Sequence, residues 1–126
     1  MGNRRYVSVP CVRCIYKSVS WNFILNQINR RYQMANLAYW VRTSCTGEGI
    51  ATKAASLVAQ YGFEKLGLQR IEIVISKENA PSLRIAEKLG ALREGLLRNR
   101  LQILGSPSDA YMHSLIPEDF GINTTA

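Results

Sequence analysis

The chain of 126 residues contains one histidine and three cysteines, and it has no uninterrupted run of 18 apolar residues. A membrane-crossing helix needs a hydrophobic stretch of about that length, so its absence excludes one. The basic residues 1–5 are not followed by an apolar stretch, because charged residues interrupt the segment 12–17. A secretory signal peptide requires such a stretch, and we therefore expect a cytoplasmic protein.

The cysteines do not form a complete metal-binding motif. Cys11 and Cys14 have the spacing of a metal or redox pair, but the sequence has no second pair of this kind. A zinc site needs about four ligands, so both Cys45 and His113 would have to converge on the pair. We expect no bound metal ion, and we interpret the thiols as packed or incidental.

Positive charge exceeds negative charge, since 16 lysines and arginines stand against 9 aspartates and glutamates. The basic residues gather at Arg4 and Arg5, at Arg30 and Arg31, and at Arg93, Arg98 and Arg100. Such an excess fits a nucleic-acid partner, an anionic cofactor or acidic surface, or simply solvated basic faces. No basic stretch is interleaved with aromatic residues as in RNA-binding modules, which argues against a nucleic-acid partner.

Hydrophobic periodicity predicts one α/β domain over residues 1–126, with the element order β-β-β-α-β-α-β-β. The predicted strands are 6–9, 21–25, 35–41, 71–75, 92–104 and 110–116, and the predicted helices are 49–66 and a shorter one from Pro81 to Gly90. Turns are predicted at 26–31 and 105–109, so that 22–41 forms an antiparallel hairpin. The strand-helix-strand unit over 36–76 should be a right-handed parallel crossover.

The helical periodicity also predicts which helix faces are buried. In the first helix the predicted inner stripe is Ile50, Ala54, Leu57, Val58, Tyr61 and Leu66, opposite Lys53, Gln60, Glu64 and Lys65. In the second helix the inner stripe is Ile85, Ala86 and Leu89. Gly67 and Gly90 are predicted to end the two helices, because glycine readily takes the left-handed conformation found there.

A glycine-containing loop links the apolar strand 38–41 directly to the first helix. Gly47 and Gly49 let the backbone approach a ligand closely, and the first N–H groups of the helix have no partner within it. With the helix dipole, these groups form an anion site suited to phosphate. A dinucleotide fingerprint fails because Thr52 occupies the third glycine position, and a Walker loop fails because Thr52-Lys53 replaces its Gly-Lys-Ser/Thr ending.

Several ordered motifs around this loop resemble the GCN5-related N-acetyltransferases (GNAT), in particular the branch that acetylates the N-termini of ribosomal proteins. They are Asn36-Leu37-Ala38-Tyr39-Trp40-Val41-Arg42, Gly47-Glu48-Gly49-Ile50-Ala51, Arg70-Ile71-Glu72-Ile73, Asn79-Ala80-Pro81-Ser82, Ala86-Glu87-Lys88-Leu89-Gly90-Ala91 and Glu94-Gly95. The resemblance covers roughly residues 22–120, whereas 1–20 are divergent. It implies a mixed, mostly antiparallel sheet with two main helices, and direct transfer of an acetyl group from acetyl-CoA to a primary amine of a protein N-terminus or small molecule.

The resemblance also implies where acetyl-CoA binds. Backbone amides of the loop would wrap the pyrophosphate, from Thr46, Gly47, Glu48, Gly49, Ile50 and Ala51. The strand that carries Tyr39, Trp40 and Val41 would pair with the pantetheine arm, and a main-chain N–H there would polarise the thioester carbonyl. Ser44 stands where the family has Gln or Arg, and Arg42 can substitute for that side chain at the phosphates.

Asn79 and Ser82 match family positions beside the pantetheine arm and the thioester sulfur. The resemblance implies that Asn79 binds the amides of the arm and that Ser82 protonates the departing thiolate. Both residue types are also preferred caps at helix starts, where this segment is predicted to lie. A purely structural role is therefore an equal alternative for Ser82.

No residue is singled out as the base that takes the proton from the acceptor amine. Glu48, Glu78 and Glu94 are candidates, but each could equally be a surface charge. Tyr111 and Tyr39 are possible proton donors, although aromatic residues on strands usually serve packing. His113 is expected to be an ordinary packed or surface imidazole.

Fuller members of the family have a strand and two helices before the matched portion, and residues 1–20 do not show that pattern. One face of the sheet would then be uncovered, and exposed apolar strands promote self-association, so we expect a homodimer. Two functions stay open: an N-acetyltransferase, and a non-catalytic CoA-binding or interaction module derived from one. The sequence does not name the acceptor amine.

Overall fold

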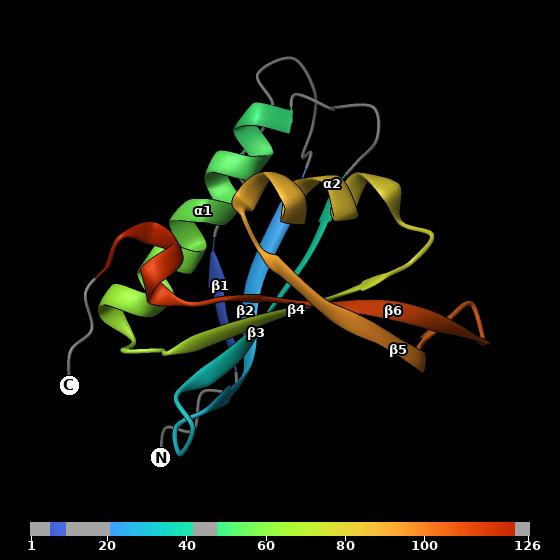
Figure 1. Ribbon diagram of the computed structural model, residues 1–126, viewed down its shortest axis with the longest axis horizontal. Helices are drawn as coiled ribbons and strands as arrows, with labels where there is room; N and C mark the ends of the chain where they lie inside the picture. Colours follow the sequence, from blue (N-terminus) through green and yellow to red (C-terminus); the bar gives the residue numbers. More distant parts are fainter. Residues whose placement is uncertain (1–5, 10–20, 42–47, 123–126) are drawn as a thin grey trace.

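The computed structural model describes residues 6–9, 21–41 and 48–122. The strands in these ranges are β1 (Tyr6–Val9), β2 (Trp21–Asn29), β3 (Met34–Val41), β4 (Arg70–Ser76), β5 (Leu92–Ile103) and β6 (Ser106–Leu115). The helices are α1 (Glu48–Lys65) and α2 (Ala80–Leu89), and a short 3-10 helix, η1, spans Pro117–Phe120. This order confirms the predicted α/β fold (Figure 1).

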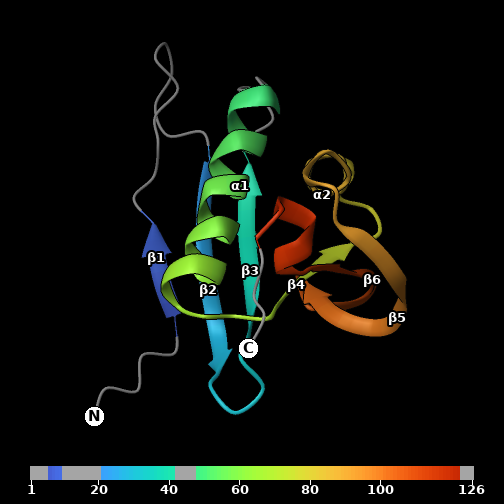
Figure 2. The same cartoon turned by 60° about the vertical axis from the view of Figure 1, so that its left-hand side comes forward.

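All six strands belong to one sheet, in the spatial order β1-β2-β3-β4-β6-β5. β3 and β4 are parallel and are joined through α1, and the other neighbouring strands are antiparallel. The structure therefore confirms the predicted hairpin over 22–41 and the parallel pairing predicted for the unit over 36–76. In Figure 2 α1 lies along β2 and β3, and α2 lies on the side of β4, β5 and β6.

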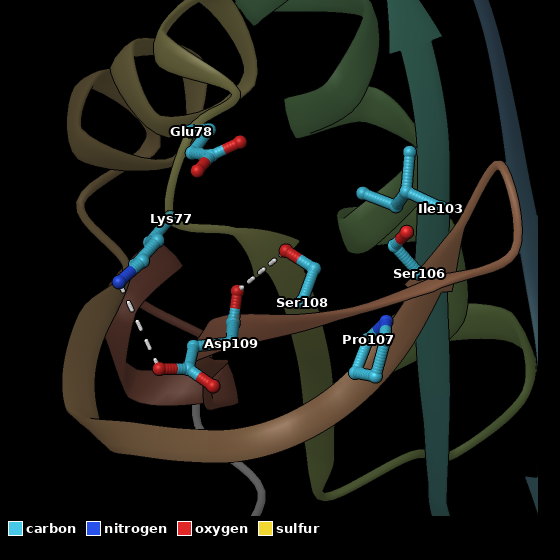
Figure 3. A pocket seen from close by; sticks show the side chains of 7 residues that line it. All are labelled: Lys77, Glu78, Ile103, Ser106, Pro107, Ser108 and Asp109. Atoms are coloured by element: carbon cyan, nitrogen blue, oxygen red, sulfur yellow. Dashed lines mark hydrogen bonds and ion pairs between the residues drawn. The ribbon is translucent and has the colours of Figure 1, made fainter.

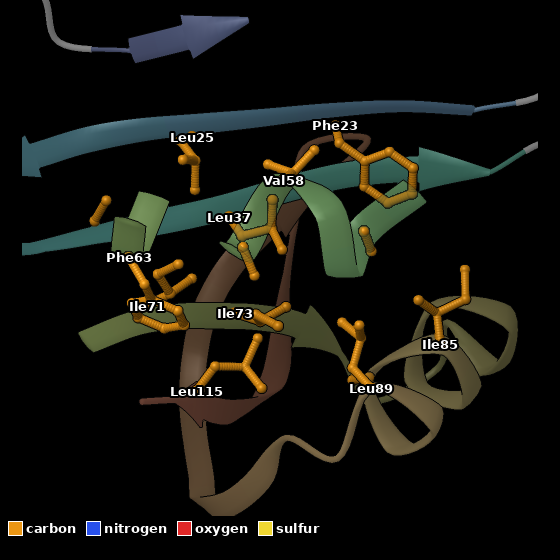
Figure 4. Packing of buried hydrophobic residues seen from close by; sticks show 14 of the residues in the cluster. Phe23, Leu25, Leu37, Val58, Phe63, Ile71, Ile73, Ile85, Leu89 and Leu115 are labelled. Atoms are coloured by element: carbon orange, nitrogen blue, oxygen red, sulfur yellow. The ribbon is translucent and has the colours of Figure 1, made fainter. Parts of the chain in front are cut away.

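The hydrophobic core lies between the sheet and the two helices (Figure 4). Strands β2, β3 and β4 contribute alternate residues, as expected when one face of a sheet is covered. These residues are Phe23, Leu25, Ala35, Leu37, Ile71, Ile73 and Ile75, and they meet Ala51, Ala55, Val58, Ala59 and Phe63 of α1 and Ile85, Ala86 and Leu89 of α2. The inner stripe predicted for the second helix is thus confirmed.

The inner stripe predicted for α1 is partly wrong. Val58 is buried, but Leu57 and Tyr61 are 61% and 44% exposed. Small residues face the sheet instead, and a Cβ atom built on Gly62 would lie 3.0 Å from Leu68 Cδ1. At Gly62 the helix therefore approaches its neighbours too closely for a large side chain, which hydrophobicity alone does not reveal.

Two predicted turn boundaries are also wrong. β2 continues through the predicted turn to Asn29, because an irregularity after Asn26, with Gln27 at a φ of 51°, lets polar residues stay in the sheet. β6 begins at Ser106, and only Leu104 and Gly105, at φ values of 53° and 82°, form the turn before it. Pro107 is tolerated in β6 because β4 pairs with this strand only from Ala110 onward.

No helix among the described residues is long and apolar enough to cross a membrane. The described ranges also contain no group of three or more histidine, cysteine, aspartate or glutamate residues that could hold a metal ion. Cys11, Cys14 and Cys45, the three thiols considered above as ligands, lie outside those ranges.

His113 is a packed imidazole, in agreement with one of the two expected environments. It lies on β6 between Ile73 of β4 and Arg93 of β5 and is 1% exposed. Neither ring nitrogen has a hydrogen-bond partner in the part of the chain that the structure describes. Burial, reinforced by the charge of Arg93, lowers the pKa of His113 below its ordinary value, and the nearby backbone of Ile73, the charge of Glu87 and the backbone of Tyr111 oppose this only in part.

This lowered pKa predicts a loss of stability in mild acid. The unfolded chain takes up a proton at its only histidine as the pH falls through about 6.5, whereas the folded chain resists that proton until a lower pH. We expect the free energy of unfolding to fall between about pH 7 and pH 5, by at most about 1.4 kcal/mol per pH unit. Urea unfolding of wild type and His113→Met across this range measures the effect, and an equal slope in the two proteins would contradict it.

Candidate cofactor cleft

The parallel strands β3 and β4 are paired over only part of their length. Their register joins Met34 to Arg70, Ala35 to Ile71 and Asn36 to Glu72, and no pair follows. β3 nevertheless continues to Val41 and β4 to Ser76, and Figure 1 shows the two strands diverging. The facing N–H and C=O groups beyond Asn36 and Glu72 therefore lack a partner strand and can bind an extended ligand.

A cavity of about 150 Å³ lies in this divergence. Both strands line it, together with the start of α2 and the distal half of β5. Its lining residues are Leu37, Tyr39, Ile73, Val74, Ile75, Ser76, Asn79, Ser82, Leu101 and Ile103. The structure thus brings together three residues from the sequence-predicted site, Tyr39, Asn79 and Ser82.

Asn79 and Ser82 form the first turn of α2. Asn79 is the N-cap, and its side-chain oxygen accepts a hydrogen bond of 3.3 Å from the Ser82 N–H. Ser82 itself is 3% exposed and forms part of the cavity lining. Capping therefore accounts for Asn79, whereas it does not use the Ser82 hydroxyl.

Tyr39 connects β3 to this first turn. Its hydroxyl donates a hydrogen bond of 2.8 Å to the Ser82 main-chain carbonyl. Its ring packs against Phe23, with centroids 5.3 Å apart, and burial raises the pKa of Tyr39 well above its ordinary value. The Tyr39 proton is therefore held by a structural contact, so the resting arrangement does not favour Tyr39 as a proton donor.

A second, more polar cavity of about 320 Å³ adjoins the first (Figure 3). Ile103 lines both cavities, and the Ser76 and Ser108 hydroxyls, which are 3.0 Å apart, connect their walls. Its charged lining comprises Lys77, Glu78 and Asp109, with Lys77 Nζ 3.8 Å from an Asp109 carboxylate oxygen. The Asp109 carboxylate is already engaged, because it also accepts a hydrogen bond of 2.8 Å from the Asn99 N–H.

Of the three glutamates considered as bases, Glu94 is already engaged. It accepts two hydrogen bonds from the Arg70 guanidinium, at 3.0 and 2.8 Å, and one from Ser114 at 2.7 Å. Arg70 and then Ser114 lower the pKa of Glu94 to about 2, which makes it a poor proton acceptor. Glu78 lies beside the cleft, and the Glu48 side chain lies outside the described part of the chain.

Part of the predicted phosphate site lies outside the described residues, and the rest belongs to β3 and α1. Arg42, Thr46 and Gly47 lie outside the described residues. The backbone of Trp40 and Val41 belongs to β3, and that of Glu48, Gly49 and Ile50 forms the start of α1. Ala51 is also in α1, where its side chain is 1% exposed and belongs to the core.

Sequence reasoning did not find the apolar wall of the cleft. Leu101 and Ile103 reach it from β5, which lies two strands away from β4 in the sheet. No spacing or motif connects these residues to β3, since only the tertiary arrangement brings them to the cavity. The residue types did not indicate a site either, because an apolar residue on a strand ordinarily indicates packing.

The sequence profile of the acetyltransferase (GNAT) domain matches residues 22–92, which include both diverging strands and the start of α2. The chain belongs to the GNAT acetyltransferase family. This membership confirms the family that the sequence motifs predicted.

Other members of the GNAT family are similar over most of this chain. An uncharacterized N-acetyltransferase, p20, of Bacillus licheniformis is 34% identical over 95 residues, or 75% of this chain and 53% of the relative. Spermidine N(1)-acetyltransferase of Escherichia coli K12 is 34% identical over 86 residues, or 68% of this chain and 46% of the enzyme.

A solved GNAT structure also superposes well. Mycobacterium smegmatis RimJ, determined with CoA-disulfide, has a TM-score of 0.75 and 28% identity, covering 82% of this chain and 50% of RimJ. The chain thus spans about half the length of these relatives. The similarity establishes the family and the fold that this portion shares with them.

Proposed function

We propose that this GNAT chain binds acetyl-CoA in the cleft between β3 and β4 and transfers its acetyl group to a primary amine. The observation that carries the proposal is the divergence of the two parallel strands after Asn36 and Glu72, with Asn79 and Ser82 at its open end. The relatives support the proposal, since the relative whose name states its substrate is a spermidine N(1)-acetyltransferase. Binding of CoA in the RimJ structure supports the choice of donor.

The residues of the cleft suit a pantetheine arm. The arm is extended and carries two amides, which can pair with the unpaired main-chain groups of β3 and β4 as an added strand would. Tyr39, Trp40 and Val41 lie on the β3 side, and Asn79 at the end of the β4 side offers a side-chain amide. We place the phosphates at the start of α1, at residues 46–51 and beside Arg42, where helix N–H groups and the dipole favour anions.

The reaction needs two proton movements. The amine nitrogen attacks the thioester carbonyl, a C–N bond forms, the C–S bond breaks, and the amine loses a proton. The departing thiolate needs a proton, and we propose that the buried Ser82 hydroxyl supplies it while solvent restores the proton to Ser82. A main-chain N–H of β3 would stabilise the developing oxyanion, an effect of about 3 kcal/mol in comparable sites.

We propose that the acceptor enters through the polar cavity beside the cleft. Glu78 belongs to its lining, and a carboxylate there attracts a protonated amine. We propose Glu78 as the base, because Glu94 is engaged by Arg70 and Ser114. This environment suits acceptors that carry positive charge, whether a protein N-terminus or a small polyamine. The 150 Å³ cleft combines aliphatic residues such as Leu101 and Ile103 with Asn79 and Ser82, a mixture that suits the acetyl group and the amide-bearing arm.

Two further expectations accompany this proposal. The homodimer is a proposal supported by apolar side chains on the edge strand and its turn, since Leu92, Leu96 and Leu104 are 64%, 48% and 101% exposed. Sedimentation at micromolar concentration tests it, and a stable monomer would contradict it. A cytoplasmic location is proposed from the sequence alone.

Calorimetry with CoA, followed by a thiol-release assay with acetyl-CoA, tests the function. The panel should contain N-terminal peptides, spermidine and a primary amine that is uncharged at neutral pH, such as aniline. We expect CoA binding and thiol release that matches acetylated product, with the cationic amines preferred. Binding without any turnover would favour the non-catalytic module, and absence of binding would refute both readings.

A further inference from the structure

One hydrogen bond crosses the open end of the cleft. Tyr39 belongs to β3, whereas Ser82 belongs to α2, which follows β4 after only three residues. The bond from the Tyr39 hydroxyl to the Ser82 carbonyl, at 2.8 Å, therefore joins the two walls beyond the point where β3 and β4 stop pairing. No other hydrogen bond among those of the described residues links β3 to the first turn of α2.

The Tyr39 ring has little freedom to move. It packs against Phe23 on the neighbouring strand, with the ring planes 44° apart, and it lines the cavity beside Leu37. A ring held on one side by packing and on the other by its hydroxyl fixes the position of the carbonyl that it contacts. The direction of the bond is also fixed, because a carbonyl can only accept.

Contacts to both main-chain polar groups of Ser82 consequently hold this residue in place. Its N–H donates to the Asn79 side chain at 3.3 Å, and its C=O accepts from Tyr39. The Ser82 side chain lies between these two anchors, and within the described residues no hydrogen bond engages its hydroxyl. The anchors therefore orient Ser82 without consuming the group that the proposed reaction uses.

We propose that Tyr39 is a positioning residue that sets the place of the Ser82 hydroxyl in the cleft. This inference rests on the proposed function, because it assigns Tyr39 an effect that passes through Ser82. Small displacements of a reacting group cost large factors in rate, up to about 100-fold for about 1 Å. The loss of one of two anchors should have a smaller effect of about tenfold.

A double-mutant cycle in the full chain tests this inference. We expect Tyr39→Phe to lower kcat about tenfold while the Kd for CoA stays within about twofold of the wild-type value. In a Ser82→Ala background the same change should have no further effect on kcat, because there is no hydroxyl left to position. Tyr61→Phe, on the exposed face of α1, is the matched control and should equal wild type.

The outcomes separate the two proposals. Wild type without turnover on any amine refutes the proposed function and, with it, this inference. Active wild type with an equally active Tyr39→Phe overturns the inference alone, even if the variant melts at a lower temperature. Equal losses in both backgrounds also overturn it, since Tyr39 would then act independently of Ser82.

Discussion

Alanine at position 82 is expected to lower kcat about 100-fold and to leave the Kd for CoA nearly unchanged. The hydroxyl is needed only when the thiolate departs, so its loss should spare ground-state binding. The fold should survive, because Asn79 caps α2 and its contact to the Ser82 N–H does not involve the hydroxyl. Thiol release under saturating amine measures kcat, and calorimetry measures the affinity.

Ser56→Ala provides the matched control for this experiment. Ser56 is a half-buried serine of α1, and its hydroxyl accepts a hydrogen bond from Gln60 far from the cavity lining. The control should retain wild-type kcat. A Ser82→Ala enzyme that is as active as this control would show that the Ser82 hydroxyl has no part in proton transfer.

Gly62→Val is expected to destabilise the protein by about 3 kcal/mol. Its Cβ alone would lie 3.0 Å from Leu68 Cδ1, 3.2 Å from Leu25 Cδ1 and 3.3 Å from Ile71 Cδ1. Two further methyl groups would push α1 away from the sheet, and the gain in helix propensity over glycine, about 1 kcal/mol at most, does not compensate. Urea unfolding followed by circular dichroism gives the free energy of unfolding.

Gly95→Val is the control for the added volume. Gly95 lies in β5, where an added Cβ would meet no atom within 4 Å, and its φ is not in the left-handed region. We expect its free energy of unfolding to change by less than about 0.5 kcal/mol. Similar losses in the two variants would show that the close approach of α1 to the sheet does not depend on Gly62.

The sequence predicts those parts of the fold that local patterns determine. The nearly continuous β-branched run 71–75, the cap at Asn79 and the left-handed end at Gly90 all coincide with the structure. The hydrophobic pattern does not predict the buried face of α1 correctly, because packing places small residues inside and some larger apolar residues outside. Leu57 and Tyr61 are exposed, whereas the smaller Ala51, Ala55 and Ala59 pack in the core beside Val58 and Phe63.

The candidate site likewise has one part that could be predicted from the sequence and one part that could not. Asn79 and Ser82 could be predicted because they form a local motif at a helix start. The divergence of β3 and β4 could not be predicted, because no residue type in either strand indicates where pairing with a strand distant in sequence ends. The Tyr39 contact to Ser82 spans 43 residues of sequence, so only the folded arrangement reveals it.

Under the proposed function, the hairpin of β5 and β6 would give this protein a means of altering its selectivity. Leu101 and Ile103 line the cleft, yet neither belongs to the buried cluster that α1 and α2 form with the sheet. Substitutions at these two positions can enlarge or narrow the space for a substrate while the scaffold keeps its stability. Under the proposed function, single changes in this peripheral ribbon would therefore alter the space for the acyl group at Leu101, and at Ile103 also the space for the acceptor.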